Sequence, residues 1–409
     1  MPVFAHLNIS DSRERWMVGL TDLALAPLAW AAHGRVPPRD PRRILVLRLE
    51  RIGDLLMTLP ALDRLRHEHP RAEITLVVGS WNRDIARLYD GATKVETLDL
   101  PWLARDGRGP SWPALVRAAL AWRGRFDAVV NFEPDIRSNF LAFLSGAPCR
   151  LGFDAGGGAA FLTHPRAFDA KRHTTENALR LVEDLPSSAP EERSTRPRAG
   201  FRVSDDARAS VATLLGPSGE SAAPLLVVHA SGGRAIKQWP PERFGAATAE
   251  LALEMGAVVA FTGAEADRPL VDAAMSAFSG VRPAIELCGR LDLAQLAALV
   301  ERAALVLCGD TGPMHLASAL ARPVVAVFGP SQPVRYGPIG APHRVVRVDL
   351  PCSPCNRIRQ PPARCTGHTP DCLAQIDVAA VVAAGRELLF AVRDGNETRA
   401  RAAEPGRPA

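Results

Sequence analysis

The 409-residue sequence contains no uninterrupted apolar run of the roughly 18 residues that a membrane-spanning helix needs. A standard signal peptide is also missing, because the first apolar stretch begins only at Trp16 and is broken by Asp22 and Pro27. We therefore expect a cytoplasmic protein.

Lysine and cysteine are both scarce. Only three of the 49 basic residues are lysines, namely Lys94, Lys171 and Lys237. Such a preference for arginine is typical of a genome rich in G and C, so a lysine that persists is either chemically needed or retained by chance. Seven cysteines in 409 residues are too few for a disulfide scaffold.

The charge is neither large nor concentrated. The formal net charge is +5, and the arginines form no continuous basic stripe of the kind that nucleic-acid-binding domains carry. Apolar residues make up 47% and charged residues 23%, as in ordinary globular domains. No segment repeats with a period of about 20–50 residues. These features exclude a disordered chain and a solenoid and argue against nucleic acid as a partner. The length predicts two or three domains.

Short apolar runs alternate with helical patterns along most of the chain. Such alternation predicts parallel sheets that are covered by helices on both faces. The predicted strands cover residues 43–47, 74–79, 127–132, 225–230, 257–263, 285–288, 304–310, 323–329 and 344–349. The predicted helices cover residues 53–67, 113–123, 241–255, 292–302, 313–320 and 376–393.

The α/β pattern is interrupted at 184–224, where Pro, Ser and Gly are frequent, and we expect a linker there. The fold is thus predicted as α/β, with two Rossmann-like, doubly wound domains facing a cleft. The parts expected are an N-terminal extension, a first domain, a second domain, a C-terminal helix and a flexible tail, at residues 1–42, 43–200, 201–375, 376–395 and 396–409.

Residues 16–32 form an apolar segment with Trp16 and Trp30 near its two ends. Tryptophan favours the interface between a membrane and water. The segment is either a helix that packs on the neighbouring domain or a helix that lies at a membrane surface.

The turns after the strands are the first places to search for a site, because ligands of open α/β sheets bind at the carboxyl ends of the strands. After the strand at 43–47, Asp54 opens the next helix. Its carboxylate either caps that helix or acts as a base at the edge of the cleft.

Two further turns suit an anionic ligand. The small residues 230–233 would let backbone N–H groups approach a phosphate, and Lys237 follows as a compact cation. The segment 310–315 ends a strand and starts a helix, whose free N–H groups make an anion site. Each turn also has a structural interpretation, as a surface lysine beside Trp239 and as a helix cap with a packed histidine. The two turns together favour a diphosphate ligand.

The chain resembles glycosyltransferase family 9, the bacterial ADP-heptose:lipopolysaccharide heptosyltransferases, in three segments. These are RILVLRLERIGDLLMTLPAL, KQWPPERF and CGDTGPMHLASALARPVVAVFGPS. The resemblance covers residues 43–393 and implies a GT-B fold, with an acceptor-binding first domain and a nucleotide-sugar-binding second domain. It implies that the last helix packs back on the N-terminal domain. It also implies an inverting transfer, with one carboxylate as base and no covalent intermediate.

The resemblance assigns a catalytic position, an acceptor-binding position and several donor-binding positions. Asp54 matches the base of the family, and Arg137 matches a basic residue that faces an anionic acceptor. The positions that match donor-binding residues are Ser231, Gly232, Lys237, Glu265, Asp310, Thr311, Gly312 and His315.

Within this donor set, the resemblance implies that Lys237 meets the diphosphate, Asp310 the sugar hydroxyls and Glu265 the ribose. Thr311, Gly312 and His315 match the phosphate-binding turn and helix start. The chain departs from some members at 230–232, where they have hydroxyl residues before the lysine. Here Ser231 alone offers a hydroxyl, so backbone N–H groups are expected to contribute more.

Four of the seven cysteines lie within residues 352–372, and they are Cys352, Cys355, Cys365 and Cys372. The first two have a Cys-x2-Cys spacing typical of half a zinc site, but the other two lack it. The cluster is either a structural zinc site, a set of reduced thiols or a set of local disulfides. The implied reaction itself requires no metal or other cofactor.

The sequence thus predicts a transferase that moves heptose from ADP-heptose, or a related nucleotide sugar, to the inner core of lipopolysaccharide at the membrane face. We expect a monomer that is cytoplasmic or peripheral on the inner membrane. Two alternatives are a GT-B transferase with another nucleotide sugar or glycan acceptor, and a non-catalytic protein that binds sugar nucleotides.

Overall fold

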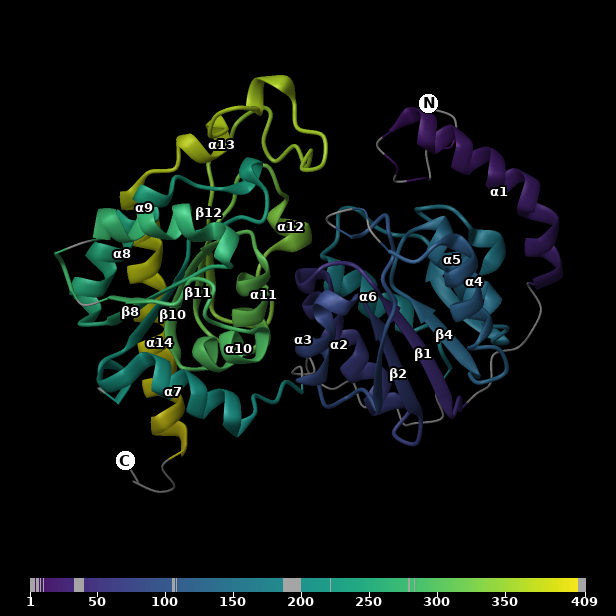
Figure 1. The fold of residues 1–409 in the computed structure, drawn as a ribbon, viewed down its shortest axis with the longest axis horizontal. Coiled ribbons are helices and arrows are strands. Elements are labelled where there is room, and N and C mark those ends of the chain that lie inside the picture. The colour runs from purple at the N-terminus through teal and green to yellow at the C-terminus, as the bar shows by residue number, and fades with distance from the viewer. Residues whose placement is uncertain are drawn as a thin grey trace. The chain divides into compact units, whose positions relative to one another are not determined.

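The computed structural model describes residues 4, 7, 9, 11–32, 40–104, 107, 109–186, 200–220, 222–278, 280–282 and 284–403. The chain divides into two compact units, Met1–Arg202 and Val203–Ala409. Each unit has its own parallel sheet flanked by helices (Figure 1). The division lies between residues 202 and 203, two residues after the boundary expected from the sequence, which was between 200 and 201.

The first unit contains a six-stranded parallel sheet in the order β3-β2-β1-β4-β5-β6. Its strands are β1 (Arg43–Arg48), β2 (Glu73–Val78), β3 (Lys94–Thr97), β4 (Ala128–Asn131), β5 (Cys149–Phe153) and β6 (His164–Arg166). Its helices are α1 (Ser12–Ala32), α2 (Ile52–Glu68), α3 (Arg83–Arg87), α4 (Trp112–Leu120), α5 (Ile136–Leu144) and α6 (Thr174–Val182), with 3-10 turns η1 (Ser80–Asn82) and η2 (Ala159–Phe161).

The second unit repeats this topology in the order β12-β11-β10-β7-β8-β9. Its strands are β7 (Leu225–His229), β8 (Val258–Thr262), β9 (Ala284–Glu286), β10 (Ala303–Gly309), β11 (Val324–Val327) and β12 (His343–Val346). Its helices are α7 (Asp205–Glu220), α8 (Pro241–Met255), α9 (Arg268–Phe278), α10 (Leu293–Glu301), α11 (Gly312–Ala319), α12 (Pro333–Tyr336), α13 (Asp371–Ala374) and α14 (Val378–Ala403), with 3-10 turns η3 (Ala235–Lys237), η4 (Glu265–Asp267) and η5 (Ala363–Cys365).

The central strands are continuous apolar runs because helices cover both their faces. All but the first residue of β1 is buried, and so is every residue of β4 and β7. On one face of each sheet, the apolar side chains of these strands meet those of the covering helices in a buried core. The predicted fold class, two Rossmann-like α/β domains, is confirmed.

Three strands of the first sheet, β3, β5 and β6, were not predicted. The edge strands β3 and β6 are short and only partly buried, so they lack an apolar run. Pro165 is tolerated in β6 because an edge strand can leave one N–H unpaired. In β5 the polar Arg150 is buried, where its guanidinium donates to the carbonyls of Phe161 and Ala147 at 2.7 and 2.6 Å.

The segment 184–224, expected to be a linker, contains the helix α7. Its residues Val211 and Leu215 are buried, and Gln295 of α10 donates a hydrogen bond of 2.7 Å to the Ser210 hydroxyl. The Pro-, Ser- and Gly-rich composition that suggested a linker therefore lies partly before this packed helix and partly in its C-terminal end, where Gly216 departs from helical geometry. Residues 187–199 lie outside the described part of the chain.

The C-terminal helix α14 packs on the second unit, against α8, β11 and β12. Its residues Val381, Val382 and Leu388 are buried in the core of that unit. The expectation that this helix packs back on the N-terminal domain stays a prediction. The helix extends to Ala403, into the expected tail, whose residues 404–409 lie outside the described part of the chain.

The helix α1 contacts η2 in the first unit, so the apolar N-terminal segment does pack on the neighbouring domain. Within the described residues, every helix is too short or too polar to cross a bilayer. The side chain of Trp30 lies outside that description.

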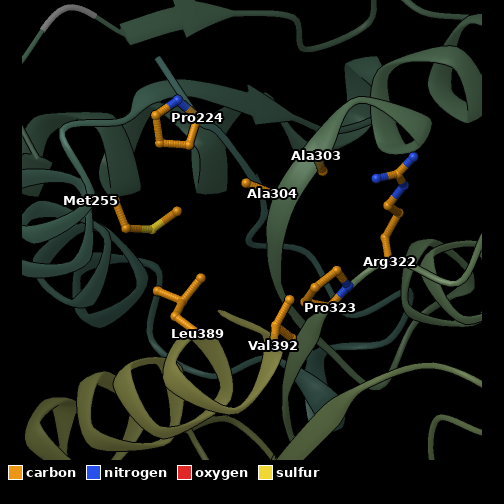
Figure 2. A pocket seen from close by; sticks show the side chains of 8 residues that line it. All are labelled: Pro224, Met255, Ala303, Ala304, Arg322, Pro323, Leu389 and Val392. Carbon is orange, nitrogen blue, oxygen red and sulfur yellow. The ribbon is translucent and has the colours of Figure 1, made fainter. Parts of the chain in front are cut away.

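A cavity of about 300 Å³ lies at the amino-terminal edge of the second sheet (Figure 2). Pro224 precedes β7, Pro323 precedes β11, and Met255 and Leu389 close the cavity from α8 and α14. This is the edge opposite to the one where parallel α/β sheets bind their ligands.

Candidate functional site

Each sheet places two of the predicted site residues where its strand order reverses. In the first unit, Asp54 follows β1 and Arg137 follows the neighbouring strand β4. In the second unit, Lys237 follows β7 and Asp310 follows the neighbouring strand β10. The carboxyl ends of such strand pairs form the crevice in which open α/β sheets bind ligands.

Asp54 is the third residue of α2. The helix begins after Arg51, whose side chain makes no capping hydrogen bond, so the interpretation of Asp54 as the helix cap is wrong. Its carboxylate oxygen Oδ1 instead lies 3.3 Å from Nη2 of Arg48, and its side chain remains 23% exposed. Asp54 is thus oriented by an ion pair and still reachable from solvent.

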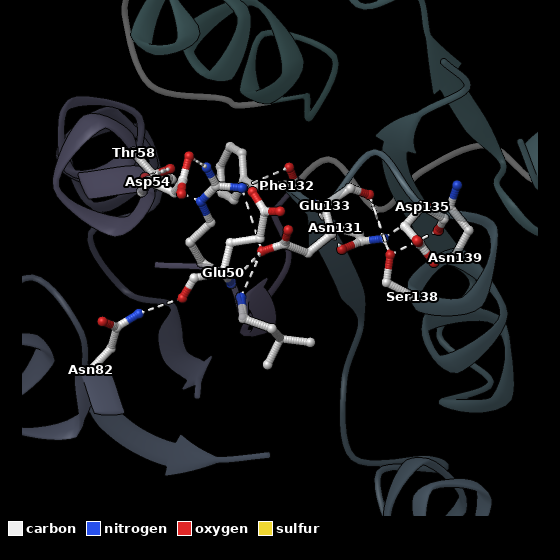
Figure 3. A network of polar contacts seen from close by, with 12 residues as sticks. Glu50, Asp54, Thr58, Asn82, Asn131, Phe132, Glu133, Asp135, Ser138 and Asn139 are labelled. Carbon is white, nitrogen blue, oxygen red and sulfur yellow. Dashed lines mark hydrogen bonds and ion pairs between the residues drawn. The ribbon is translucent and has the colours of Figure 1, made fainter. Parts of the chain in front are cut away.

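Arg48 is the last residue of β1 and is buried. Its guanidinium donates to the backbone carbonyls of Asp54 and Phe132, at 3.1 Å each, and lies 3.4 Å from Oε1 of Glu133. This guanidinium joins the start of α2 to the turn after β4, and Figure 3 shows Asp54, Phe132 and Glu133 around this junction. The planar guanidinium group has several N–H donors and can therefore bond both segments at once.

Glu133 was missed by the sequence analysis, although it lies in the turn after a predicted strand. Its Oε1 accepts hydrogen bonds from the backbone N–H groups of Leu49 and Glu50, at 2.6 and 3.1 Å. The signal that could have identified it is a carboxylate two residues after the apolar strand β4. Glu133 therefore fixes the loop that leads into Asp54.

The same loop is held from the other side by residues that follow β2. The carbonyl of Glu50 accepts from Nε1 of Trp81 at 2.9 Å and from Nδ2 of Asn82 at 2.7 Å. Side chains from both neighbouring strands thus bond the backbone that precedes Asp54. Groups held in this way keep a catalytic carboxylate in one orientation.

The charges around Arg48 shift the pKa values of the buried pair. Burial alone would lower the pKa of Arg48, but the carboxylates of Glu133, Asp54 and Glu50 outweigh it and raise that pKa. Burial raises the pKa of Glu133, and the charge of Asp54 adds to the rise, against the opposing effects of Arg48 and two backbone N–H groups. Arg48 therefore stays cationic. Of the two carboxylates that pair with it, Asp54 is more exposed than Glu133.

Arg137 is the second residue of α5 and is tied to Asp135, the residue that caps that helix. Asp135 accepts hydrogen bonds from the backbone N–H and from Nε of Arg137, at 2.8 and 2.9 Å. The guanidinium lies 4.3 Å from the ring centroid of Trp102, and its side chain is 35% exposed. Arg137 is thus a pre-oriented, accessible cation in the unit that contains Asp54.

Lys237 and Asp310 form a close ion pair in the second unit. Nζ of Lys237 lies 2.7 Å from Oδ2 of Asp310, and the two side chains are 19% and 9% exposed. The structure thus joins two turns that lie 73 positions apart in the sequence (310 − 237). The earlier alternative, a surface lysine beside Trp239, is wrong because Lys237 is largely buried in this pair.

The helix α11 begins beside this pair. Its N-cap residue is Thr311, whose side chain makes no capping hydrogen bond, and Gly312 and Pro313 form its first turn. Asp310 is therefore not the cap. His315 is buried at the end of that turn. The backbone N–H groups of a first turn have no partner inside the helix and attract anions.

Ser231 is joined to the buried His229. Thr262 donates its single hydroxyl proton to the carbonyl of Val228 at 3.1 Å, so it accepts from Nδ1 of His229, also at 3.1 Å. Burial lowers the pKa of His229 to about 4, so the ring is neutral near pH 7. Its Nε2 is then an acceptor, and the Ser231 hydroxyl, 2.8 Å away, donates to it. Ser231 thus presents oxygen lone pairs rather than a proton to its other neighbours.

Gly232 and Glu265, the remaining donor-binding candidates, differ in their surroundings. Gly232 lies against the backbone of Lys237, where a Cβ would be 2.9 Å from the carbonyl oxygen, so no larger residue fits without movement. Glu265 in η4 follows β8, pairs with Arg268 at 2.7 Å and is 70% exposed. It lies one strand beyond the Lys237 turn, at the same edge of the sheet.

The cysteine-rich loop is anchored beside β11. Ser353 donates to the carbonyl of Gly329 at 3.0 Å, and Asn356 donates its N–H to that of Pro330 at 2.7 Å. All four cysteines of the loop are free thiols, and burial together with neighbouring thiols raises the pKa of Cys372. Over the described residues, no group of three or more His, Cys, Asp or Glu side chains has a metal-binding arrangement, and the zinc alternative stays a prediction.

The sequence profile of glycosyltransferase family 9 (heptosyltransferase) matches residues 117–364. A search of curated protein sequences gives no significant match. Many solved structures match this chain, among them the following three. A glycosyl transferase family 9 protein from Veillonella parvula DSM 2008 has a TM-score of 0.72 and 23% identity, over 88% of this chain and 100% of its own. The E. coli ADP-heptose lps heptosyltransferase II has a TM-score of 0.68 and 20% identity, over 86% and 99%.

The third is E. coli heptosyltransferase WaaC with ADP-2-deoxy-2-fluoro heptose, with a TM-score of 0.62 and 21% identity, over 84% of this chain and 99% of its own. These similarities identify the two parallel sheets as the domains of a GT-B fold. The family match covers more than half of the chain. This chain therefore belongs to glycosyltransferase family 9, the heptosyltransferase family, and is a glycosyltransferase.

Proposed function

We propose that this glycosyltransferase transfers heptose from ADP-heptose to the inner core of lipopolysaccharide. The family match and the names of two relatives support this donor and acceptor. The observation that carries the proposal is the Lys237–Asp310 pair beside the start of α11. It combines a cation with a helix N-terminus, which together suit a diphosphate.

The donor would bind at the carboxyl edge of the second sheet. The ammonium of Lys237 and the first-turn N–H groups of α11 would neutralise the diphosphate, whose charge grows as it leaves. Asp310 holds Lys237 in place and has a second oxygen for the sugar hydroxyls. The lone pairs of Ser231 suit a hydroxyl of the donor, and the exposed carboxylate of Glu265 suits the ribose.

The acceptor would be activated at the first switch point, the place between β1 and β4 where the strand order of the first sheet reverses. The oxygen of its hydroxyl attacks the anomeric carbon, the bond from that carbon to the diphosphate oxygen breaks, and the hydroxyl proton passes to the carboxylate of Asp54. One displacement inverts the anomeric carbon. Arg48 orients Asp54, and Arg137 is the cation that we assign to anionic groups of the acceptor.

In this proposal, the assigned residues carry out the reaction without a metal or another cofactor. We further propose that the enzyme works as a monomer in the cytoplasm or on the inner face of the inner membrane, where a lipopolysaccharide acceptor is accessible.

Calorimetry with ADP-heptose, ADP, UDP and GDP tests the donor assignment. We expect ADP-heptose to bind most tightly, and Lys237→Ala to weaken its binding by about 10- to 150-fold, as expected for a charge-assisted contact. The control Lys171→Ala removes an exposed lysine of the first unit and should leave the affinity unchanged. Equal affinity of Lys237→Ala and the parent protein would move the donor site elsewhere.

A further inference from the structure

The helix α1 packs on the first unit through one face and leaves the opposite face exposed. Successive residues of a helix are about 100° apart. One side of α1 therefore contains Gly19, which is buried against the ring of Phe4, and positions 15, 18, 22 and 25, which are partly buried. The other side contains positions 13, 16, 17, 20, 23, 24 and 27, which are exposed. The burial pattern thus shows which side of α1 faces the first unit.

The docked face is the more polar one. Oδ1 of Asp22 accepts a hydrogen bond of 2.6 Å from the backbone N–H of Gly158. Val18 lies directly over Gly157, where any side chain would clash with it. Arg15 donates to the carbonyl of Ile9 at 3.3 Å. Two of the five positions on this side are therefore charged residues with polar contacts.

The exposed face is the apolar one. The exposed fractions of its four largest apolar side chains are Trp16 48%, Met17 57%, Leu20 56% and Leu23 62%. Thr21, next to this stripe, donates its hydroxyl proton to the carbonyl of Met17 at 2.8 Å. This proton therefore already has an acceptor and needs no hydrogen bond to water. A surface helix normally turns its apolar side to the core. The reversed arrangement of α1 indicates a partner for the stripe.

The composition of the stripe matches the surface of a bilayer. Trp16 has the amphipathic ring that favours the headgroup level, and the aliphatic side chains beside it suit the outer acyl region. Arg13 continues the stripe at its N-terminal end and is exposed, where a cation meets anionic headgroups.

We propose that α1 is a docking helix that lies flat on an anionic bilayer, with Arg13, Trp16, Met17, Leu20 and Leu23 in contact with lipid and the first unit held above them. The proposal deepens the proposed function and rests on it for its purpose, because a lipopolysaccharide acceptor is itself anchored in a membrane. The contacts with lipid follow from the stripe alone.

Sedimentation of the full chain with lipid vesicles tests the proposal. We expect binding to vesicles of phosphatidylethanolamine with phosphatidylglycerol, and a loss of about tenfold or more in Leu20→Glu. The matched control is Leu253→Glu, which changes a leucine of the second unit that is 59% exposed and should bind as the parent does. Arg13→Gln should weaken binding to these vesicles but not to vesicles of uncharged phosphatidylcholine.

Three results would overturn the proposal: a parent protein that does not sediment with the anionic vesicles, a Leu20→Glu variant that sediments as the parent does, or a parent dimer that Leu20→Glu converts to a monomer. The last result would assign the stripe to a second copy of the chain. Nucleotide affinity and circular dichroism of Leu20→Glu should equal those of the parent protein. Vesicle binding without heptose transfer would contradict the proposed function but leave the docking helix intact.

Discussion

Asp54 and Lys237 show which candidate site residues a sequence can reveal. Both lie in turns directly after apolar strands, and the family resemblance assigned both before any contact was known. Arg48 could not be found in this way. Glu133 does follow an apolar strand, but its role depends on a contact with Arg48, 85 positions away in the sequence. The role of His229 could not be predicted either, because its partner Thr262 lies on the neighbouring strand β8.

The first prediction concerns Asp54 as the base. Asp54→Asn keeps an acceptor for Arg48 but cannot take a proton, so turnover should fall by about 10²–10⁴-fold with donor affinity unchanged. Asp54→Ala should lose the same activity. Its stability should fall by only about 1 kcal/mol, because Arg48 retains Glu133 as a partner. Steady-state kinetics and thermal unfolding measure the two effects. Parent turnover in Asp54→Asn would exclude Asp54 as the base.

The second prediction concerns the ring of His229. Nitrogen NMR of the ¹⁵N-histidine-labelled protein at pH 7 should give a neutral ring with the proton on Nδ1. Its folded pKa of about 4 lies below the usual 6.5. The stability that the neutral ring contributes is therefore present above pH 6.5 and is lost as the pH falls through about 4, by on the order of 3 kcal/mol. A proton on Nε2 would instead make Ser231 an acceptor from the ring and a donor toward the nucleotide sugar.

At the scale of elements, the central strands were predictable and the edges were not. Central strands such as β1, β4 and β7 are buried on both faces and show as apolar runs in the sequence. The edge strands β3 and β6 need no such run, and the C-terminal end of α7 itself contains residues typical of a linker. The packing of α14 on the second unit depends on tertiary contacts, which no local pattern encodes.

The third prediction concerns the loop between β1 and α2. Glu133→Ala removes the acceptor of two backbone N–H groups and the partner of a buried guanidinium. Unfolding should become easier by about 3–5 kcal/mol, and turnover should fall because Asp54 loses its fixed position. Glu133→Gln keeps an oxygen acceptor and should recover part of both losses. Denaturant unfolding and kinetics on the same samples measure this. Parent values in Glu133→Ala would show that the loop is held by other contacts.

The fourth prediction concerns the cysteine-rich loop. As free thiols, the exposed Cys352 and the partly buried Cys355 and Cys365 should react with a thiol reagent much faster than the buried Cys149 and Cys308. Burial also raises the pKa of Cys149 to about 12, which leaves almost no thiolate. Slow reaction of all the loop thiols together with one equivalent of zinc by elemental analysis would instead identify a metal site.

At the scale of the whole molecule, the two units repeat one topology with different chemistry at the same place. The first switch point offers a carboxylate oriented by a buried arginine, and the second offers a lysine beside a helix N-terminus. A base in one unit and an anion site in the other are the two requirements of an inverting transfer from a nucleotide sugar.

The direct test of this account is mass spectrometry of a heptose-free lipopolysaccharide acceptor after incubation with the enzyme and ADP-heptose, with released ADP measured in the same sample. We expect one heptose added to the acceptor for each ADP released, and ADP release that depends on the acceptor. ADP release without a heptosylated acceptor, or the same yield from a UDP- or GDP-sugar, would contradict the proposed transfer.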